Sequence, residues 1–231
     1  MDKSDVQETL TSLYLRLNGY FVSGFIVHAP TKNTTEMDVL AVRFPHHQEP
    51  EREVQCCERL LIPDDRIDFL VGEVKGGQGT VNFNHRFRAN PGSIRTVLRR
   101  FGAFDAAETD RLTKEIPALL DPIKLRRAAD FPQMDVICST QTGRASAKLR
   151  FVPFATEQER SDNPKRPYIF ADDLLAFVWK CFRPEQRRPL CDDSYNYDLW
   201  GPQFSKMVRH LKEPTRESPG TMADLYSLYG V

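Results

Sequence analysis

Long apolar runs are missing from this sequence of 231 residues. None approaches the roughly 20 consecutive apolar residues of a membrane-spanning helix, and the opening MDKSDVQETL lacks the apolar centre of a secretion signal. We therefore expect no membrane association and a cytoplasmic location. An excess of one charge is missing too, since 32 Lys and Arg balance 32 Asp and Glu. Net charge therefore favours neither a nucleic acid nor a membrane as partner, and any such preference must come from local clusters.

Cysteine is scarce: the chain has five, an odd number, scattered along its length. This pattern does not fit a disulfide framework. His46 and His47 lie near Cys56 and Cys57, but their spacing matches none of the usual zinc-ligand patterns. We expect a loop with buried thiols there rather than a metal site.

The composition is that of an ordinary globular protein, 40% apolar and 28% charged. Apolar spacing and a Ser4-x-x-Gln7 capping box predict a first helix that begins at Ser4. Strand patterns at 20–28 and 37–44 predict a hairpin, with Gly24 as a bend or bulge, and 67–75 reads as a third strand. A helix at 92–104, further helix at 111–130 broken by Pro117 and Pro122, and strands at 134–140 and 148–154 follow. This order predicts an α/β fold with a mixed sheet flanked by helices.

We expect one domain over residues 1–155, with residues 45–66 as an insertion. Residues 155–167 are polar and contain two prolines, which is typical of a linker. Helical patterns at 171–182 and from Trp200 to Leu211 predict a helical extension over residues 156–231, which either packs on the core or forms an interface. The last residues are expected to be loosely held.

An acid and a lysine lie two positions apart in LVGEVKGG, residues 70–77. Side chains at such spacing share one face of a strand, so Glu73 and Lys75 lie side by side at the end of an otherwise apolar segment. Asp38 opens a strand expected to neighbour this one. Two carboxylates and a lysine on adjacent strands can hold a hard divalent cation and a water for phosphodiester hydrolysis. The alternative is a local ion pair at a strand end, which contributes little to stability.

Three segments give the chain a family resemblance. They are Glu8 in ETLTSLYLRLNGYFV, the strand Glu36-Met37-Asp38-Val39-Leu40-Ala41, and Phe69-Leu70-Val71-Gly72-Glu73-Val74-Lys75. Together they resemble the PD-(D/E)xK nuclease superfamily, the restriction-endonuclease-like fold, and within it the Holliday-junction-resolvase and Mrr-type branch. The resemblance covers about residues 4–140 and implies an αβββαβ core. It does not reach residues 155–231.

The resemblance implies a role for each matching residue. Asp38 and Glu73 would be metal-binding carboxylates, the carbonyl of Val74 a further ligand, and Lys75 the catalytic lysine. Glu8 would be an auxiliary acid, both catalytic and metal-binding. The implied cofactor is Mg²⁺ or Mn²⁺. The chain departs from the family in two places: Met37 stands where the name-giving proline would be, and 35 residues separate Asp38 from Glu73, a longer gap than in compact members.

Positive charge gathers locally after the third strand. Residues 86–127 contain ten Lys and Arg against five Asp and Glu, which favours phosphate contacts, although a solvated helix face explains the pattern equally well. The resemblance adds a glutamine just after the lysine. The nucleic-acid-binding candidates are Gln78, His85, Arg86, Arg88, Arg95, Arg99 and Arg100.

The expected function is a metal-dependent endonuclease that hydrolyses DNA phosphodiester bonds, in restriction, antiphage defence or DNA repair. One such site cuts one strand, so a homodimer or a larger complex is expected for duplex cleavage. The alternative is a catalytically silent nucleic-acid-binding or adaptor subunit that has kept the fold, or one that needs a partner or ligand for activation.

Overall fold

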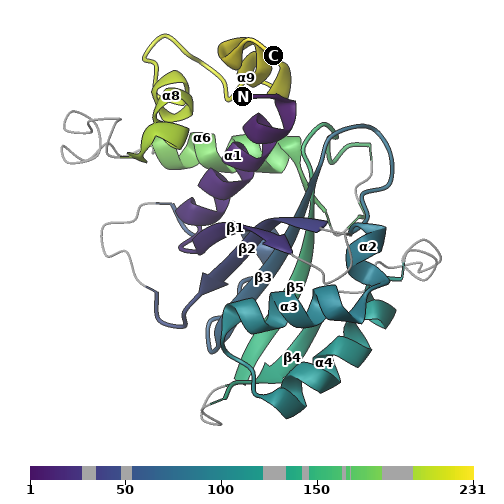
Figure 1. Ribbon diagram of the computed structural model, residues 1–231. Helices are drawn as coiled ribbons and strands as arrows, with labels where there is room; N and C mark the ends of the chain where they lie inside the picture. Colours follow the sequence, from purple (N-terminus) through teal and green to yellow (C-terminus); the bar gives the residue numbers. More distant parts are fainter. Residues whose placement is uncertain are drawn as a thin grey trace.

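The computed structural model describes residues 1–27, 35–47, 54–121, 134–141, 146–162, 165–166, 168–183 and 200–231. It shows an α/β protein in which helices cover both faces of an open, mixed sheet (Figure 1). The predicted fold class is confirmed at this level. The expected helix beyond residue 121 and residues 48–53 of the insertion lie outside the described residues.

The first helix, α1, spans Lys3–Leu17. Its N-cap is Asp2, which forms a reciprocal capping box with Asp5, so the predicted box at Ser4 is wrong. An aspartate is as good an N-cap as a serine, and placing the cap two residues earlier leaves the apolar stripe unchanged. Asn18 ends the helix and Gly19 follows with φ +83°, a left-handed turn that suits glycine.

The predicted hairpin is present. Strand β1 (Phe21–Val27) pairs antiparallel with β2 (Thr35–Arg43). The register shifts between Ser23 and Phe25, so that Asp38 and Val39 on β2 together face Gly24 on β1. This is the expected irregularity at Gly24, with the extra residue on β2. A bulge of this kind turns the side chain of the extra residue away from the regular alternation.

Strand β3 spans Ile67–Lys75, as predicted, and continues the sheet antiparallel to β2. Its other neighbour is β5 (Ser146–Ala155), which runs parallel to it along its whole length. The remaining strands, β4 (Asp135–Ser139) and the short β6 (Ile169–Phe170), both pair with β5. Among the described strands the order is therefore β1-β2-β3-β5-β4, with β6 beside the end of β5.

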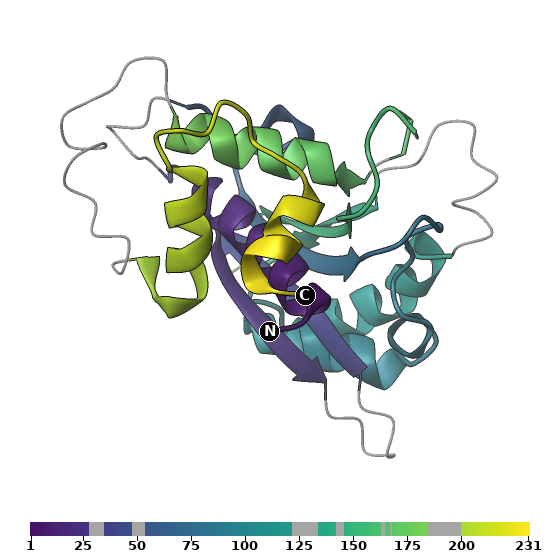
Figure 2. The same ribbon diagram turned by 90° about the horizontal axis from the view of Figure 1, so that it is seen from above.

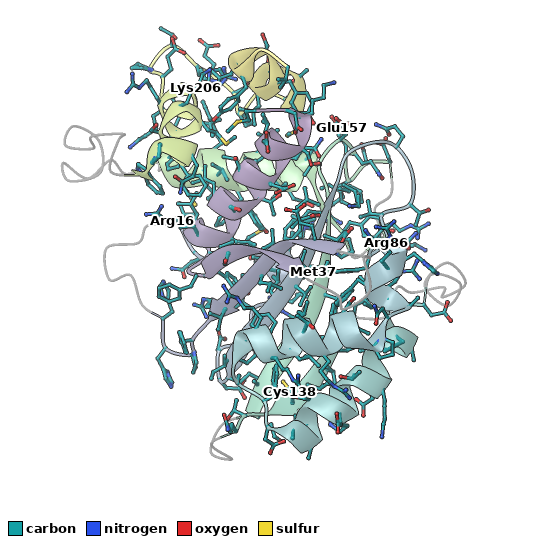
Figure 3. All side chains as sticks on the ribbon, in the orientation of Figure 1. Arg16, Met37, Arg86, Cys138, Glu157 and Lys206 are labelled. Atoms are coloured by element: carbon teal, nitrogen blue, oxygen red, sulfur yellow. The ribbon has the colours of Figure 1, made fainter. Side chains whose placement is uncertain are left out.

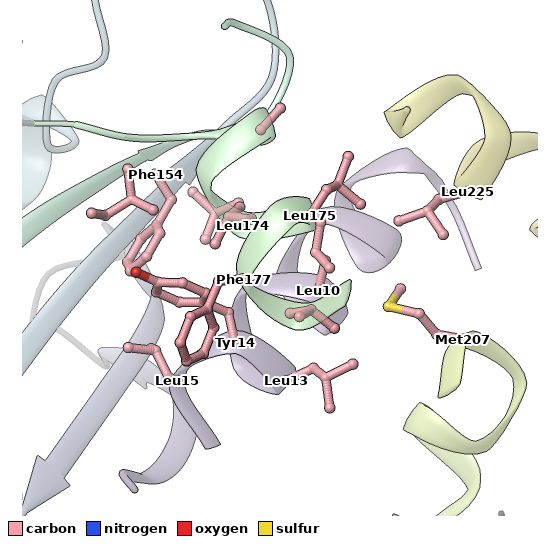
Figure 4. Close-up of a cluster of buried hydrophobic side chains, with 14 of the residues drawn as sticks. Leu10, Leu13, Tyr14, Leu15, Phe154, Leu174, Leu175, Phe177, Met207 and Leu225 are labelled. Atoms are coloured by element: carbon pink, nitrogen blue, oxygen red, sulfur yellow. The ribbon is translucent and has the colours of Figure 1, made fainter. Parts of the chain in front are cut away.

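One face of the sheet is covered by α1, α6 (Ala171–Phe182), α8 (Pro202–Leu211) and α9 (Met222–Tyr229). Seen from above, these helices gather around α1 over the sheet (Figure 2). Their apolar side chains meet those of the sheet in one buried cluster, which we call the α1-side core (Figure 4). Tyr14 lies in it, with its ring edge-on to Phe154 and Phe177.

The opposite face is covered by α2 (His85–Arg88), α3 (Pro91–Phe101) and α4 (Ala106–Leu119), which form the α3-side core. Pro117 lies inside α4 and does not break it, contrary to the prediction. It lies in the last turn, where one lost hydrogen bond costs less than the burial of Ile116 and Leu120 on either side contributes.

The C-terminal part packs on the core. The part of the expected linker at residues 155–162 is tied down, because Arg160 contacts Asp173 on α6 through its guanidinium group and Thr156 is fully buried. The tail is also not loose: α9 is capped by Thr221 and buries Leu225 and Tyr226. For these residues both predictions were wrong, because contacts with distant residues can fix a polar segment or a chain end. No helix in the described part of the chain could span a bilayer.

The insertion is anchored as well. Its described part contains the 3-10 helix η1 (Glu58–Leu60), and Leu60 is buried in the α1-side core. The Leu60 carbonyl accepts a hydrogen bond from Arg150, which also binds Asp68 with two nitrogens; Arg150 Nε lies 2.8 Å from Asp68 Oδ1. The Tyr20 hydroxyl joins this buried network by donating to Asp68 Oδ2 at 2.5 Å.

Candidate active site

Strands β2 and β3 stop pairing next to Asp38. The last paired residues are Val39 and Gly72, and the bulge in β2 comes immediately before them. Where the next backbone partner would be, the Asp38 carboxylate accepts a hydrogen bond from the Val74 backbone N–H, with Oδ2 at 2.7 Å from the nitrogen. The bulge therefore directs this side chain into the opening between the two strands.

Glu73 and Lys75 lie side by side, as the strand period predicts. Lys75 Nζ lies 2.7 Å from Glu73 Oε1 and 3.9 Å from Asp38 Oδ2. The Glu73 side chain is 1% exposed and that of Lys75 45% exposed. The structure thus brings the three predicted residues together at the carboxyl end of β3, with an acid inside and an amine at the surface.

Burial sets the electrostatics of this cluster. It raises the pKa of Glu73 from 4.5 to about 7, and the Asp38 carboxylate adds to the rise, while the Lys75 amine and the backbone N–H of Asn84 oppose it. Burial also raises the pKa of Asp38. The same burial acts to lower the pKa of Lys75, but its hydrogen bond to Glu73 and the nearby carboxylates outweigh this effect and raise it. Lys75 is therefore positively charged at neutral pH.

Glu8 faces the same region from α1. It lines, together with Asp38, a groove of about 980 Å³ between α1, β1 and α8. Burial raises the pKa of Glu8 from 4.5 to about 7, and repulsion from Asp38 and Glu36 contributes. The Glu8 carboxylate accepts a hydrogen bond from Ser4 Oγ at 3.2 Å. The auxiliary acid implied by the resemblance thus lies beside the Asp38 carboxylate, on the α1 side of the sheet.

The oxygen atoms at this place suit a hard cation. Oε2 of Glu73 is buried and has no hydrogen-bond partner among the residues that the structure describes. The Asp38 carboxylate lies in the same opening, on the N–H of Val74, whose carbonyl the resemblance implies as a further ligand. Among the described residues, no three His, Cys, Asp or Glu side chains gather closely enough to hold a metal ion by themselves. Mg²⁺ needs few protein ligands because it keeps several of its waters, so two carboxylates and a backbone carbonyl are a suitable donor set.

The candidate nucleic-acid contacts divide into two groups. The first group lies in the segment directly after Lys75 and comprises Gln78, His85, Arg86 and Arg88. His85 and Arg86 are exposed on α2, and Arg86 is labelled in Figure 3. The N-cap of this helix, Asn84, contacts Glu73 through its backbone. The other two side chains of this group are already hydrogen-bonded to backbone carbonyls. Gln78 donates to the Glu157 carbonyl, and Arg88 donates to the Phe83 carbonyl.

The second group lies on α3, further from the cluster. Arg95 pairs with Asp110, with Nη2 at 2.7 Å from Oδ1. Arg99 and Arg100 are exposed at the end of the helix. Arg100 lines a cavity of about 510 Å³ with Ile67, the first residue of β3. Since Lys75 is the last residue of that strand, Arg100 lies near the opposite end of β3 from it.

Comparisons with known proteins bring no match: no family model, curated protein or solved structure is significantly similar to the chain. Its chemistry must therefore be inferred from its own residues, above all from a buried carboxylate with one unpaired oxygen beside a lysine and a second carboxylate.

Sequence reasoning missed two residues that support this cluster. Asn84 contacts Glu73 through its backbone N–H, and the Glu157 carboxylate accepts a hydrogen bond from the Gly77 backbone N–H at 2.8 Å. No helix was predicted at residues 85–88, so no sequence pattern indicated that its N-cap Asn84 would lie next to Glu73. Glu157 lies in a segment with the composition of a linker, so no local pattern distinguished it.

Proposed function

We propose that the chain is a divalent-metal-dependent nuclease that hydrolyses DNA phosphodiester bonds, a member of the PD-(D/E)xK type. One observation carries the proposal. Asp38, Glu73 and Lys75 converge where β2 and β3 separate, with Lys75 Nζ 2.7 Å from the buried Glu73 and 3.9 Å from Asp38. A simple surface ion pair would need neither the second carboxylate nor the buried, unpaired oxygen of Glu73.

The order of the elements supports the restriction-endonuclease-like arrangement. One helix precedes an antiparallel run of three strands, helices follow on the other face, and the chain returns through β5 parallel to β3. The core implied over residues 4–140 would end on β4, but the strand beside β3 is β5, and β4 pairs with β5 instead. The αβββαβ order corresponds to this fold when β5 is taken as its last strand, with β4 and β6 beside β5. The resemblance ends there, so α6, α8 and α9 are features of this chain.

Asp38 and Glu73, with the Val74 carbonyl, would hold Mg²⁺ or Mn²⁺. A bound ion of this kind polarises the phosphoryl oxygens and lowers the pKa of a water. Positively charged Lys75 would then stabilise the negative charge that develops on the phosphate rather than accept a proton. Glu8 is better suited than Lys75 to take a proton from the attacking water, because its pKa of about 7 lies near the working pH.

Duplex cleavage would require two copies of this site, because one site cuts one strand. A homodimer or a larger complex is therefore part of the proposal. Restriction, antiphage defence and DNA repair are processes that use such an enzyme.

The first test is cleavage of supercoiled plasmid and of labelled single strands with Mg²⁺, Mn²⁺ or EDTA. The protein would be compared with its Asp38→Ala and Lys75→Ala variants. Asp135→Ala and Lys148→Ala are matched controls, since these residues form a 2.6 Å ion pair on β4 and β5 of the same sheet. In the register of β5 with β3, Lys148 lies opposite Asp68, near the start of β3 and away from Lys75.

We expect metal-dependent cutting by the unchanged protein and by both controls, and none by Asp38→Ala or Lys75→Ala. The ratio of nicked to linear plasmid would show whether two sites act together. If no metal supports cutting, while all variants are folded and bind DNA equally, the proposal fails and the silent DNA-binding subunit takes its place.

A further inference from the structure

The loop that follows Lys75 is held by a second segment of the chain. The Lys75 carbonyl accepts from the Thr156 backbone N–H at 3.1 Å. The Gly77 N–H donates to Glu157 Oε2 at 2.8 Å, and Gln158 Nε2 donates to the Gly77 carbonyl at 2.8 Å. Residues 156–158 thus fix the backbone on both sides of Gly76, directly after the candidate lysine.

The other oxygen of Glu157 reaches two helices. Oε1 accepts from the Tyr226 hydroxyl of α9 at 2.8 Å and from Gln7 Nε2 of α1 at 3.3 Å. Gln7 Nε2 also lies 2.6 Å from the Tyr226 hydroxyl. Figure 3 shows Glu157 beside the start of α1 and the long loop after β3. A single carboxylate therefore joins three segments that are far apart in sequence.

The fit around this carboxylate is tight. A Cβ atom added to Gly76 would lie 2.7 Å from Gln7 Nε2 and 3.2 Å from Glu157 Cδ, so the glycine is needed for the backbone to approach. Gln7 and Tyr226 are buried. A buried donor that is left without an acceptor destabilises the folded state. Gln7, Tyr226 and the Gly77 N–H therefore depend on the position of the Glu157 carboxylate.

We propose that Glu157 is a positioning residue of the candidate active site, and that Tyr226 makes the C-terminal helix α9 part of that site's support. Gln7 is the neighbour of Glu8, and Gly77 follows Lys75 by two residues. The Glu157 carboxylate thus fixes the helix that carries Glu8 relative to the strand end that carries Lys75. The catalytic part of the inference rests on the proposed nuclease function.

Tyr226→Phe is the sharpest perturbation, because it removes one oxygen atom and leaves the ring in place. Tyr229→Phe is its matched control: Tyr229 lies on the same helix and, like Tyr226, has a lysine amine over its ring, at 4.8 Å compared with 4.9 Å. Glu157→Gln is a second variant. All three groups that contact the Glu157 carboxylate oxygens are donors, so an amide would place an N–H against one of them.

Three quantities would be measured: the single-turnover cleavage rate, the Kd for DNA, and the amide hydrogen exchange of residues 76–79. We expect Tyr226→Phe to lower the rate by about 10-fold, since small displacements of catalytic groups have large effects on rate. The Kd should be unchanged and exchange at 76–79 faster. Tyr229→Phe should behave as the unchanged protein, and Glu157→Gln should show a larger loss than Tyr226→Phe.

The two proposals fail in different ways. If the unchanged protein does not cut DNA, the nuclease proposal is refuted, while the exchange of residues 76–79 still decides whether Glu157 and Tyr226 hold the loop. If the unchanged protein cuts DNA, and Tyr226→Phe matches Tyr229→Phe in both rate and exchange, the positioning role is refuted.

Discussion

Replacing Glu73 by glutamine should make the metal-free protein more stable at pH 8. The reason is that Glu73 is buried, with 1% of its side chain exposed, and burial raises its pKa from 4.5 to about 7. A carboxyl group whose folded pKa is raised holds its proton more tightly in the folded state. Its contribution to stability is complete below about pH 4.5 and is lost as the pH rises through about 7.

The size of the effect follows from the pKa difference. Each pKa unit corresponds to about 1.4 kcal/mol, so ionisation of Glu73 costs the folded state about 3 kcal/mol at pH 8. The raised pKa of Glu73 already includes the 2.7 Å contact with Lys75, which opposes the rise. Glutamine avoids the cost of ionisation, so we expect Glu73→Gln to be more stable by about 3 kcal/mol at pH 8, with the difference falling to below about 1 kcal/mol at pH 5.

Urea unfolding in EDTA at pH 5 and pH 8 measures this difference. Glu108→Gln is the control of opposite sign: the hydrogen bond from Arg111 lowers the pKa of Glu108, so its stabilisation is present above the ordinary pKa and lost at lower pH. That variant should be less stable than the unchanged protein at pH 8. If Glu73→Gln is also less stable at pH 8, the ion pair with Lys75 outweighs burial and the reasoning is refuted.

Three further predictions concern other parts of the molecule. Asp68→Ala should cost about 3–5 kcal/mol in urea unfolding, because it leaves the charge of Arg150, whose side chain is 7% exposed, buried without a carboxylate to neutralise it; a loss below about 1 kcal/mol would contradict this. If Arg99 and Arg100 contact phosphates, Arg99→Ala and Arg100→Ala should each reduce the slope of log Kd for DNA against log salt by about 1. Lys180→Ala on α6 should leave this slope unchanged. Equal slopes for all three variants would show that these arginines of α3 do not contact DNA. Binding of Mg²⁺, followed by calorimetry, should weaken as the pH falls below about 7, because Glu73, the proposed ligand whose pKa is raised to about 7, then takes up a proton; affinity that stays constant from pH 8 to pH 5.5 would show that Glu73 does not bind the ion.

Local sequence patterns were sufficient to predict the strands that carry Asp38, Glu73 and Lys75. A run of strand-forming residues placed β3 at 67–75, and the period of two put Glu73 and Lys75 on one face. The hairpin before it and the irregularity opposite Gly24 were also predictable, because turn residues and glycine act within a few residues of their own position. That Asp38 would be near this pair followed from pairing of consecutive strands.

The tertiary structure alone decided what surrounds the pair. Nothing in the sequence showed that the Asp38 carboxylate would replace a backbone partner at Val74, or that Glu157 would join the loop after Lys75 to α1 and α9. Residues 155–162 were predicted to be a linker from their polar composition, and the tail to be loose because it ends the chain, yet both are fixed. The physical reason is that spacing and propensity act over a few residues, whereas burial and hydrogen bonding of a polar group depend on which distant segments the fold brings to it.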